Sequence, residues 1–250
     1  MDLNDRVIVI TGAAQGIGAA TAHLCAARGA AVILADMQGE GTAREAAAIR
    51  AAGGQAEGAT VDVRDDAAVA ALFAGVRERH GRLDALICAA GILQGAYQQP
   101  DELPTATFEL VLDVNVTGSF RCAKYATPLL EADAGGVLVL LSSGGGVRGP
   151  SSSLAYGASK AGVHGLGLTL EARLAPRGIR VNTVCPGEIA TAMKLGVIAT
   201  EAERAGGDPA AAVAAASAGT RLGTPDGVAR ILAFLVSPEA DYVRGTIFTR

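Results

Sequence analysis

The feature that most constrains the fold of this sequence is an unbroken alternation of short apolar runs with longer segments of helical spacing. The first run, residues 6–10, is rich in Val and Ile and stops at Thr11-Gly12. Such runs are typical of parallel strands that are buried on both faces of a sheet. A helix is predicted next over 17–28, ended by Gly29, and a second strand over 31–35 ends at Asp36.

The same alternation continues to the end of the chain. We expect helices over residues 41–52, 67–80, 107–130, 154–174 and 225–235, and strands over 59–63, 84–89, 136–141, 179–184 and 246–249. This order predicts an α/β fold, a three-layer, doubly wound parallel sheet of about seven strands with helices on both faces. No linker marks a boundary, so residues 1–250 are interpreted as one domain. The Ala-rich stretch 199–218 favours helix and predicts a small helical substrate flap at about 191–220.

Composition excludes several classes of protein. With 50% hydrophobic and 18% charged residues, the chain is not intrinsically disordered. A net charge of −4 argues against nucleic-acid binding, and no apolar run reaches the ~20 residues that span a membrane. The apolar run Val7–Ile10 is too short for a signal peptide, which predicts a cytoplasmic protein. The four cysteines and three histidines lack metal-ligand spacing, so no metal is expected.

A glycine-rich segment, Thr11–Gly18, lies where the first strand meets the first helix. Glycines allow a tight turn there, and the free N–H groups of the helix start favour a pyrophosphate. Glycines also serve plain turns, but Asp36 follows about 20 residues later, where a carboxylate accepts both ribose hydroxyls of an adenosine. Asp36 could equally be a turn residue, or fill both roles. Its charge repels a 2′-phosphate, and neither Gln15 nor Met37 is basic, so NAD is favoured over NADP.

Tyr156 and Lys160 are four residues apart on a predicted helix and therefore share one face. A nearby ammonium lowers the pKa of a phenol from about 10, so that it can exchange protons near neutral pH. The alternative is a tyrosine packed on an amphipathic helix beside a solvated lysine. The pair follows the glycine-rich segment and a predicted buried strand that ends in Ser142-Ser143, and this context favours the catalytic interpretation.

Together these motifs resemble the short-chain dehydrogenase/reductase family of Rossmann-fold oxidoreductases, over residues 5–245. Ser143 precedes Tyr156 by thirteen residues, and this spacing makes the ordered set specific. The matching motifs are Thr11-Gly12 with Gly16 and Gly18, Asp62-Val63, Ala89-Ala90-Gly91, Asn115, Ser143, Tyr156 with Lys160, and Pro186-Gly187 with Thr191. Cys88 occupies the position where the family often has an asparagine. No side-chain amide is therefore available there, and only backbone groups can form hydrogen bonds at that position.

The resemblance implies a role for each matching residue. The cofactor pyrophosphate and adenosine ribose would be lined by Gly12, Gln15, Gly16, Ile17 and Gly18. Asp36, because of its position at the end of the second strand, and its neighbour Met37 are also expected to bind the cofactor. Asp62 and Val63 would flank the adenine, and Ala89, Ala90 and Gly91 would lie along the cofactor. Ile189 and Thr191 would hold the nicotinamide carboxamide in a pocket shaped by Pro186 and Gly187. Tyr156 would be the acid/base, and Ser143 would bind the substrate oxygen. Lys160 would bind the nicotinamide ribose and depress the pKa of Tyr156. Asn115 would hold a water that links Lys160 to solvent.

These roles imply an NAD-dependent oxidoreductase that interconverts a secondary alcohol and a ketone, with a small-molecule substrate. The resemblance also implies a homo-oligomer that pairs through the predicted helices 107–130 and 154–174. A tetramer is expected. The family usually continues into an Asp-Gly-Gly tail, whereas this sequence stops at Arg250, which is consistent with a clipped chain and leaves a dimer open.

Several alternatives stay open. An epimerase or dehydratase on this fold would keep the Tyr/Lys pair, and a non-catalytic dinucleotide-binding protein would lose part of the set. The absence of a Gly-x-Ser-x-Gly motif argues against a hydrolase. Glu188 could contact a hydroxyl or amine of the substrate, pair with the flap, or face solvent. His164 could be a proton relay or a packed side chain, and Gly144-Gly145-Gly146 could make room for a bulky substrate or ease a loop.

Overall fold

The computed structural model describes residues 1–131 and 135–249, which form one seven-stranded parallel sheet in the order β3-β2-β1-β4-β5-β6-β7. This arrangement confirms the predicted α/β fold. The central strands are apolar and buried along their whole length, as expected for strands covered on both faces. The strands are β1 (Val7–Thr11), β2 (Ala31–Asp36), β3 (Gln55–Thr60), β4 (Ala85–Cys88), β5 (Val137–Leu141), β6 (Arg180–Cys185) and β7 (Gly245–Phe248).

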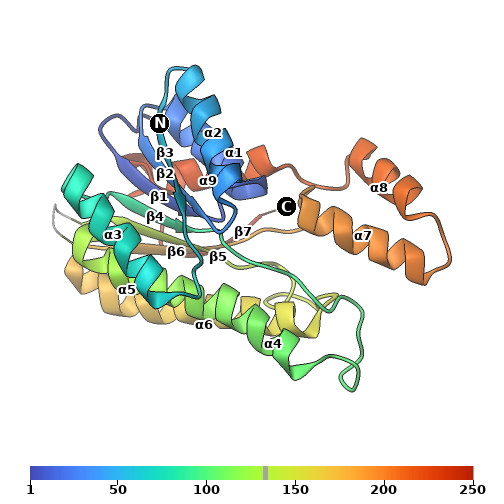
Figure 1. Cartoon of the computed structure of the whole chain (residues 1–250). Helices are drawn as coiled ribbons and strands as arrows, with labels where there is room; N and C mark the ends of the chain where they lie inside the picture. Colours follow the sequence, from blue (N-terminus) through green and yellow to red (C-terminus); the bar gives the residue numbers. More distant parts are fainter. Residues whose placement is uncertain (132–134, 250) are drawn as a thin grey trace.

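Helices cover both faces of the sheet (Figure 1). One face packs against α1 (Gly16–Ala27), α2 (Gly39–Ala51) and α9 (Pro225–Leu235), whose buried residues include Ala22, Ile49 and Leu232. The other face packs against α3 (Asp66–His80), α5 (Gly118–Leu130) and α6 (Leu154–Leu174). Two hydrophobic clusters therefore lie on either side of the sheet, as a doubly wound fold requires.

The predicted strand over 59–63 is wrong, because β3 occupies Gln55–Thr60. β3 is the edge strand and is at most half-buried, so its sequence is polar and lacks a hydrophobic signal. Val61 and Val63 supply that signal, but they are buried in the loop after β3. Most other predicted ends lie within one or two residues of the observed ones, and those of α6 and α9 agree.

The predicted helix over 107–130 is interrupted. It begins as α4 (Thr105–Leu112), widens into the π-helical segment η1 (Asp113–Thr117) and continues as α5. π-Helical turns are rare and often lie at functional sites. The buried side chain of Asn115 lies in this turn, so the irregularity affects a predicted site residue directly.

The segment predicted to form a flap folds into two helices, α7 (Ala192–Arg204) and α8 (Pro209–Ala218). They project from the sheet as a separate lobe beside the C-terminal ends of the strands (Figure 1). Val197 is the one buried residue of α7, and α8 has none among its described residues. Within the described ranges, no helix combines the length and the apolar character needed to cross a membrane.

Candidate active site

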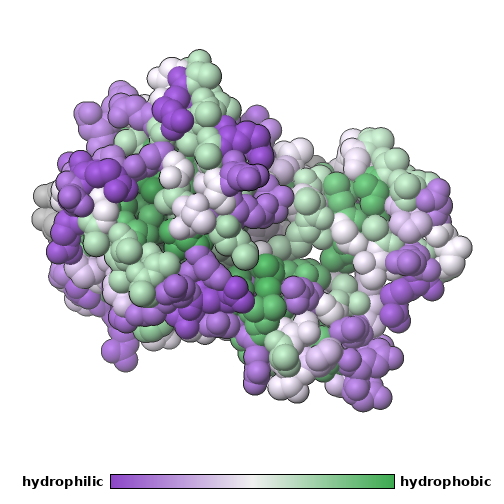
Figure 2. Space-filling model, viewed as in Figure 1, coloured by the Kyte–Doolittle hydropathy of each residue, from purple (hydrophilic) through white to green (hydrophobic). Residues whose placement is uncertain are grey.

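A cavity of about 1120 Å³ opens at the C-terminal ends of β1, β2, β4, β5 and β6. Ligands of open α/β sheets bind at this edge, where the strand order reverses between β1 and β4. Figure 2 shows apolar surface in the hollow between the main body and the α7–α8 lobe. The sequence-predicted residues that line the cavity are Gly12, Gln15, Gly16, Ile17, Gly18, Asp36, Met37, Asp62, Val63, Ala89, Ala90, Gly91, Ser143, Tyr156, Lys160, Pro186, Gly187, Ile189 and Thr191.

The glycine-rich segment forms a cradle at one end of this cavity. Gly12 has a φ of +69°, and a Cβ there would lie 2.6 Å from the backbone nitrogen of Ala90. A Cβ at Gly18 would lie 2.2 Å from the carbonyl oxygen of Gly12. No larger residue fits at these positions, and the N-terminus of α1 is thereby left facing the cavity with N–H groups that suit a pyrophosphate.

Asp36, at the end of β2, accepts hydrogen bonds from the backbone N–H groups of Ala14 (3.2 Å) and Gln38 (3.0 Å). The carboxylate thus holds the turn, as one of the two interpretations expected, and it also lines the cavity. Arg44 contacts the Ala14 carbonyl at 3.4 Å, and Arg64 lines the same end. These arginines were missed, because the sequence places neither next to Asp36.

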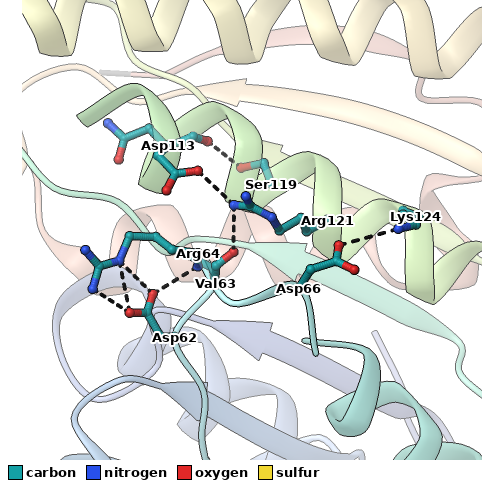
Figure 3. Close-up of polar contacts among 9 residues, drawn as sticks. Asp62, Val63, Arg64, Asp66, Asp113, Ser119, Arg121 and Lys124 are labelled. Carbon is teal, nitrogen blue, oxygen red and sulfur yellow. Dashed lines mark hydrogen bonds and ion pairs between the residues drawn. The ribbon is translucent and has the colours of Figure 1, made fainter. Parts of the chain in front are cut away.

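The carboxylate of Asp62 is held by Arg64 in a two-pronged ion pair, with contacts of 2.6 and 2.9 Å to its Oδ2 (Figure 3). The Arg64 hydrogen bonds lower the pKa of Asp62. Figure 3 also shows that Arg121 of α5 donates to the Val63 carbonyl and to Asp113. The first of these bonds holds the loop after β3 against α5. A Cβ at Gly118 would lie 2.6 Å from the Val63 side chain, so this glycine permits the close contact.

Ser143, Tyr156 and Lys160 line the cavity and lie together in its wall. Ser143 lies two residues beyond the end of β5, and α6 begins at Leu154 because the Ser153 hydroxyl accepts the Tyr156 N–H at 3.1 Å. Ser153 also donates to the Gln94 carbonyl at 2.6 Å, which ties α6 to the loop after β4. The Lys160 Nζ donates to the Leu141 carbonyl at 2.9 Å and lies 5.4 Å from the centre of the Tyr156 ring.

The electrostatics of this group differ from the prediction. Lys160 was expected to depress the pKa of Tyr156, but burial raises that pKa, and the hydrogen bond with Ser143 offsets only part of the rise. Burial also lowers the pKa of Lys160 to about 8. Desolvation disfavours the charged form of both groups, and it outweighs the attraction of a cation several ångströms from the phenol.

Asn115 is fully buried, and its side-chain amide is committed to protein partners. Its Nδ2 donates to the Ile92 carbonyl (3.0 Å) and to Ser159 (2.8 Å), while its Oδ1 accepts the Ile92 N–H at 2.8 Å. A Cβ at Gly91 would lie 3.2 Å from Asn115 Oδ1 and 3.4 Å from Lys160 Nζ. Asn115 therefore lies close to Lys160, with its side chain fixing the loop that follows Gly91.

Another part of the cavity wall is formed by the segment after β6. Gly144 donates to the Pro186 carbonyl at 2.8 Å, which joins this segment to the Ser143 loop. Thr191 caps α7 by accepting the Lys194 N–H at 3.3 Å. Glu188 forms an ion pair with Lys194 and its side chain is 52% exposed. Of the three roles left open for Glu188, the structure favours pairing with the flap, through Lys194 of α7, at a half-exposed position.

Two further open questions receive structural answers. His164 bonds Thr246 at 3.0 Å, on β7, so it packs helix against sheet. A Cβ at Gly146 would lie 2.3 Å from the Gly157 carbonyl oxygen, whereas Gly144 and Gly145 have no heavy atom closer than 3.5 Å to a Cβ. Gly146 is thus required for packing, and Gly144 and Gly145 widen the cavity that they line.

Other lining residues were not predicted, among them Tyr97, Lys194, Glu201 and Arg221. Tyr97 adopts a left-handed backbone conformation with a φ of +63° and donates its N–H to the Ser152 carbonyl at 2.6 Å. These side chains come from loops and the lobe, so only the tertiary fold brings them to the cavity. The described residues contain no group of three potential metal ligands.

Comparison with known proteins agrees with this architecture. A family model described as enoyl-(acyl carrier protein) reductase matches residues 12–249. A cis-4-hydroxycyclohexanecarboxylate dehydrogenase of Sinomonas cyclohexanicum is 40% identical over 97% of this chain and 94% of its own length. A cyclohexanol dehydrogenase of an Acinetobacter species is 34% identical over 97% and 92%, respectively. The structure of NAD+-bound xylitol dehydrogenase has a TM-score of 0.89 and 30% identity, and the match covers 99% of this chain and 98% of that one.

Proposed function

This chain belongs to the short-chain dehydrogenase/reductase family, and we propose that it interconverts a secondary alcohol and a ketone with NAD(H) as cofactor. Its relatives include dehydrogenases named for alcohol substrates, which supports oxidoreduction at secondary alcohols. The observation that carries the proposal is the meeting of Ser143, Tyr156 and Lys160 inside a cavity whose glycine cradle suits a dinucleotide.

The residues present fit a nicotinamide dinucleotide. The cradle at Gly12 and Gly18 would close if either residue carried a Cβ, and it lies at the start of α1. Gln15, Gly16 and Ile17 would complete the phosphate site, and Asp36 with Met37 would hold the adenosine ribose. When bound, the dinucleotide accepts or supplies the hydride. The protein must then orient the substrate and move a proton to or from its oxygen.

In the reducing direction, the Tyr156 phenol donates its proton to the carbonyl oxygen as negative charge develops there. Its raised pKa keeps it protonated and ready to donate at neutral pH. Ser143 donates a hydrogen bond to the same oxygen and stabilises the developing charge. Oxidation of an alcohol runs this step in reverse, with the phenolate form of Tyr156 accepting the hydroxyl proton.

Tyr156 must then recover or release its proton. Lys160, with a pKa of about 8, exchanges protons near neutral pH and lies behind the tyrosine. We propose that a water held at Asn115 links Lys160 to solvent. Since the Asn115 side chain is committed to Ile92 and Ser159, its backbone carbonyl is the group left to bind that water, beside the 2.7 Å hydrogen bond from Ser119.

Asp36 supports NAD as the cofactor, because its carboxylate would repel a 2′-phosphate at the adenosine ribose. The two nearby arginines do not remove this charge, since Arg64 is paired with Asp62 and Arg44 with Glu45. A structural relative is described as NAD+-bound, in keeping with this choice.

For the substrate, we propose a secondary alcohol on a saturated ring. The cavity that holds Tyr156 is also lined by Leu93, Met193, Val197 and Ile198, while Gly144 and Gly145 leave space. A roomy cavity with these apolar side chains in its wall fits a ring whose hydroxyl points to Ser143 and Tyr156. Two relatives are named for cyclohexane alcohols.

The Tyr156→Phe variant tests this function. Phenylalanine keeps the ring and removes the proton, so turnover of cyclohexanol with NAD should fall by a factor of ~100 or more while NADH binding persists. Absorbance at the NADH band and a fluorescence titration give the two readouts. Activity within a few-fold of the unsubstituted enzyme would exclude Tyr156 as the acid/base.

A further inference from the structure

Four charged side chains line the part of the cavity that borders the α7–α8 lobe: Glu188, Lys194, Glu201 and Arg221. Glu188 and Lys194 form an ion pair. Glu201 accepts a hydrogen bond from Tyr97, and burial and this contact raise the pKa of the Tyr97 phenol. Among the residues that the structure describes, the Arg221 guanidinium has no hydrogen-bond or ion-pair partner. The lobe side of the cavity therefore offers one uncommitted cation.

The loop that carries Arg221 is fixed beside the catalytic segment. Gly223 donates its N–H to the Glu188 carbonyl at 2.8 Å, and its own carbonyl accepts the Ala190 N–H at 2.9 Å. Leu222, the residue after Arg221, is buried. The same segment is bonded to the Ser143 loop through the Pro186 carbonyl. Backbone hydrogen bonds thus join the loop of Arg221 to residues 188–190, and join Pro186 of the same segment to the Ser143 loop.

The chemistry of a guanidinium defines what it can bind here. Its planar fork of N–H donors matches a carboxylate, which accepts two parallel charge-assisted hydrogen bonds. The same cavity is lined by Ser143 and Tyr156 and by the apolar side chains of Met193, Val197 and Ile198. Resting on the proposed function, we propose that Arg221 binds a carboxylate that the ring substrate carries at a distance from its hydroxyl-bearing carbon.

The charged side chains beside Arg221 suggest an alternative role for it, an ion pair within the lobe. Glu188 and Glu201 would repel an anion, but Lys194 balances the first and the Tyr97 hydroxyl bonds the second. The four formal charges sum to zero, so the attraction must come from direct contact with the guanidinium. If Arg221 instead paired with Glu201 to brace the lobe, its removal would weaken the binding of charged and neutral ligands alike.

Binding of unreactive ligands tests the proposal without turnover. Calorimetry would compare cyclohexanecarboxylate with the neutral cyclohexanecarboxamide on the full-length protein, with and without NADH. Arg221→Ala should weaken carboxylate binding by about tenfold or more and leave the carboxamide within about twofold, because only the charge-assisted contact is lost. Arg221→Lys should retain part of the affinity. Arg204→Ala removes the same charge from α7 at an exposed position outside the cavity and should change neither ligand.

Equal weakening of both ligands in Arg221→Ala, or an equal effect of Arg204→Ala, would overturn the proposal. So would an unsubstituted protein that binds the carboxylate no better than the carboxamide. Kinetics separate this proposal from the proposed function. Arg221→Ala should raise KM for cis-4-hydroxycyclohexanecarboxylate about tenfold and leave that for cyclohexanol unchanged. Failure to oxidise either alcohol would reject the proposed function, while the calorimetric comparison would still decide the role of Arg221.

Discussion

At the level of single residues, burial governs the chemistry of Lys160. It lowers the pKa of this group from 10.5 to about 8, so between these values the unfolded chain binds more protons than the folded one. The free energy of unfolding therefore rises with pH across this window, and the buried ammonium destabilises the fold below it. The upper limit of that penalty is on the order of 3 kcal/mol.

Lys160→Met should consequently be more stable than the unsubstituted protein at pH 7, by on the order of 1–3 kcal/mol. The difference should shrink as the pH rises from 8 toward 10. Urea unfolding at a series of pH values measures it. The matched control is Lys124→Met, which removes an exposed lysine and should give no stabilisation that declines with pH. A constant difference across the series would contradict the lowered pKa.

Asp36 is the second residue that leads to a testable prediction, because it should select the cofactor. NAD should be preferred over NADP by at least about tenfold in kcat/KM, and Asp36→Ala should narrow this ratio because the repelling carboxylate is gone. Asp36→Ala with Met37→Arg should narrow it further or invert it. Steady-state kinetics with both cofactors provide the measurement, and a preference of the unsubstituted enzyme for NADPH would show that Asp36 does not select the cofactor.

At the level of elements, α6 shows how a local signal and a tertiary contact combine. Its start at Leu154 was predicted, and the structure shows that the Ser153 hydroxyl caps the helix and also donates to the Gln94 carbonyl. Ser153→Ala removes both contacts, so it should destabilise the protein by about 1–2 kcal/mol and also lower kcat, because Tyr156 lies in the first turn. Asp65→Ala removes a comparable cap from α3, at a residue that does not itself line the cavity, and should lower stability with a smaller effect on kcat. Thermal unfolding and initial rates distinguish the two, and equal rates in both variants would contradict a positioning role for Ser153.

The elements also show which features the sequence could predict. Buried strands such as β1 and β5 carry a continuous apolar signal, and the glycine cradle and the Tyr156–Lys160 spacing are local patterns. β3 was misplaced because an edge strand needs no such signal, and the π-helical turn at Asn115 arises from packing that no periodicity encodes. The raised pKa of Tyr156 and the arrival of Arg221 at the cavity depend on burial and on loops distant in sequence.

At the scale of the whole molecule, the two helices predicted to pair between copies each carry an exposed apolar side chain. Phe120 on α5 is 48% exposed and Leu168 on α6 is 50% exposed. Gly165, one turn before Thr169 on α6, has open space where a Cβ would lie, which would allow another helix to approach closely. We expect the exposed face of α5 and α6 to pair with a second copy of the chain, within a tetramer or a dimer.

Phe120→Glu with Leu168→Glu should therefore dissociate the oligomer, because two carboxylates would be buried without partners at each copy of the face. Light scattering at micromolar concentration should give two or four times the mass of 25.0 kDa for the unsubstituted protein and a monomer for the double variant. Ala47→Glu, on the exposed side of α2 in the opposite helix layer, introduces a charge of the same kind and should leave the assembly intact. If the unsubstituted protein is itself a monomer, the pairing through α5 and α6 is wrong. If both the double variant and Ala47→Glu keep the full mass, the copies associate through a different face.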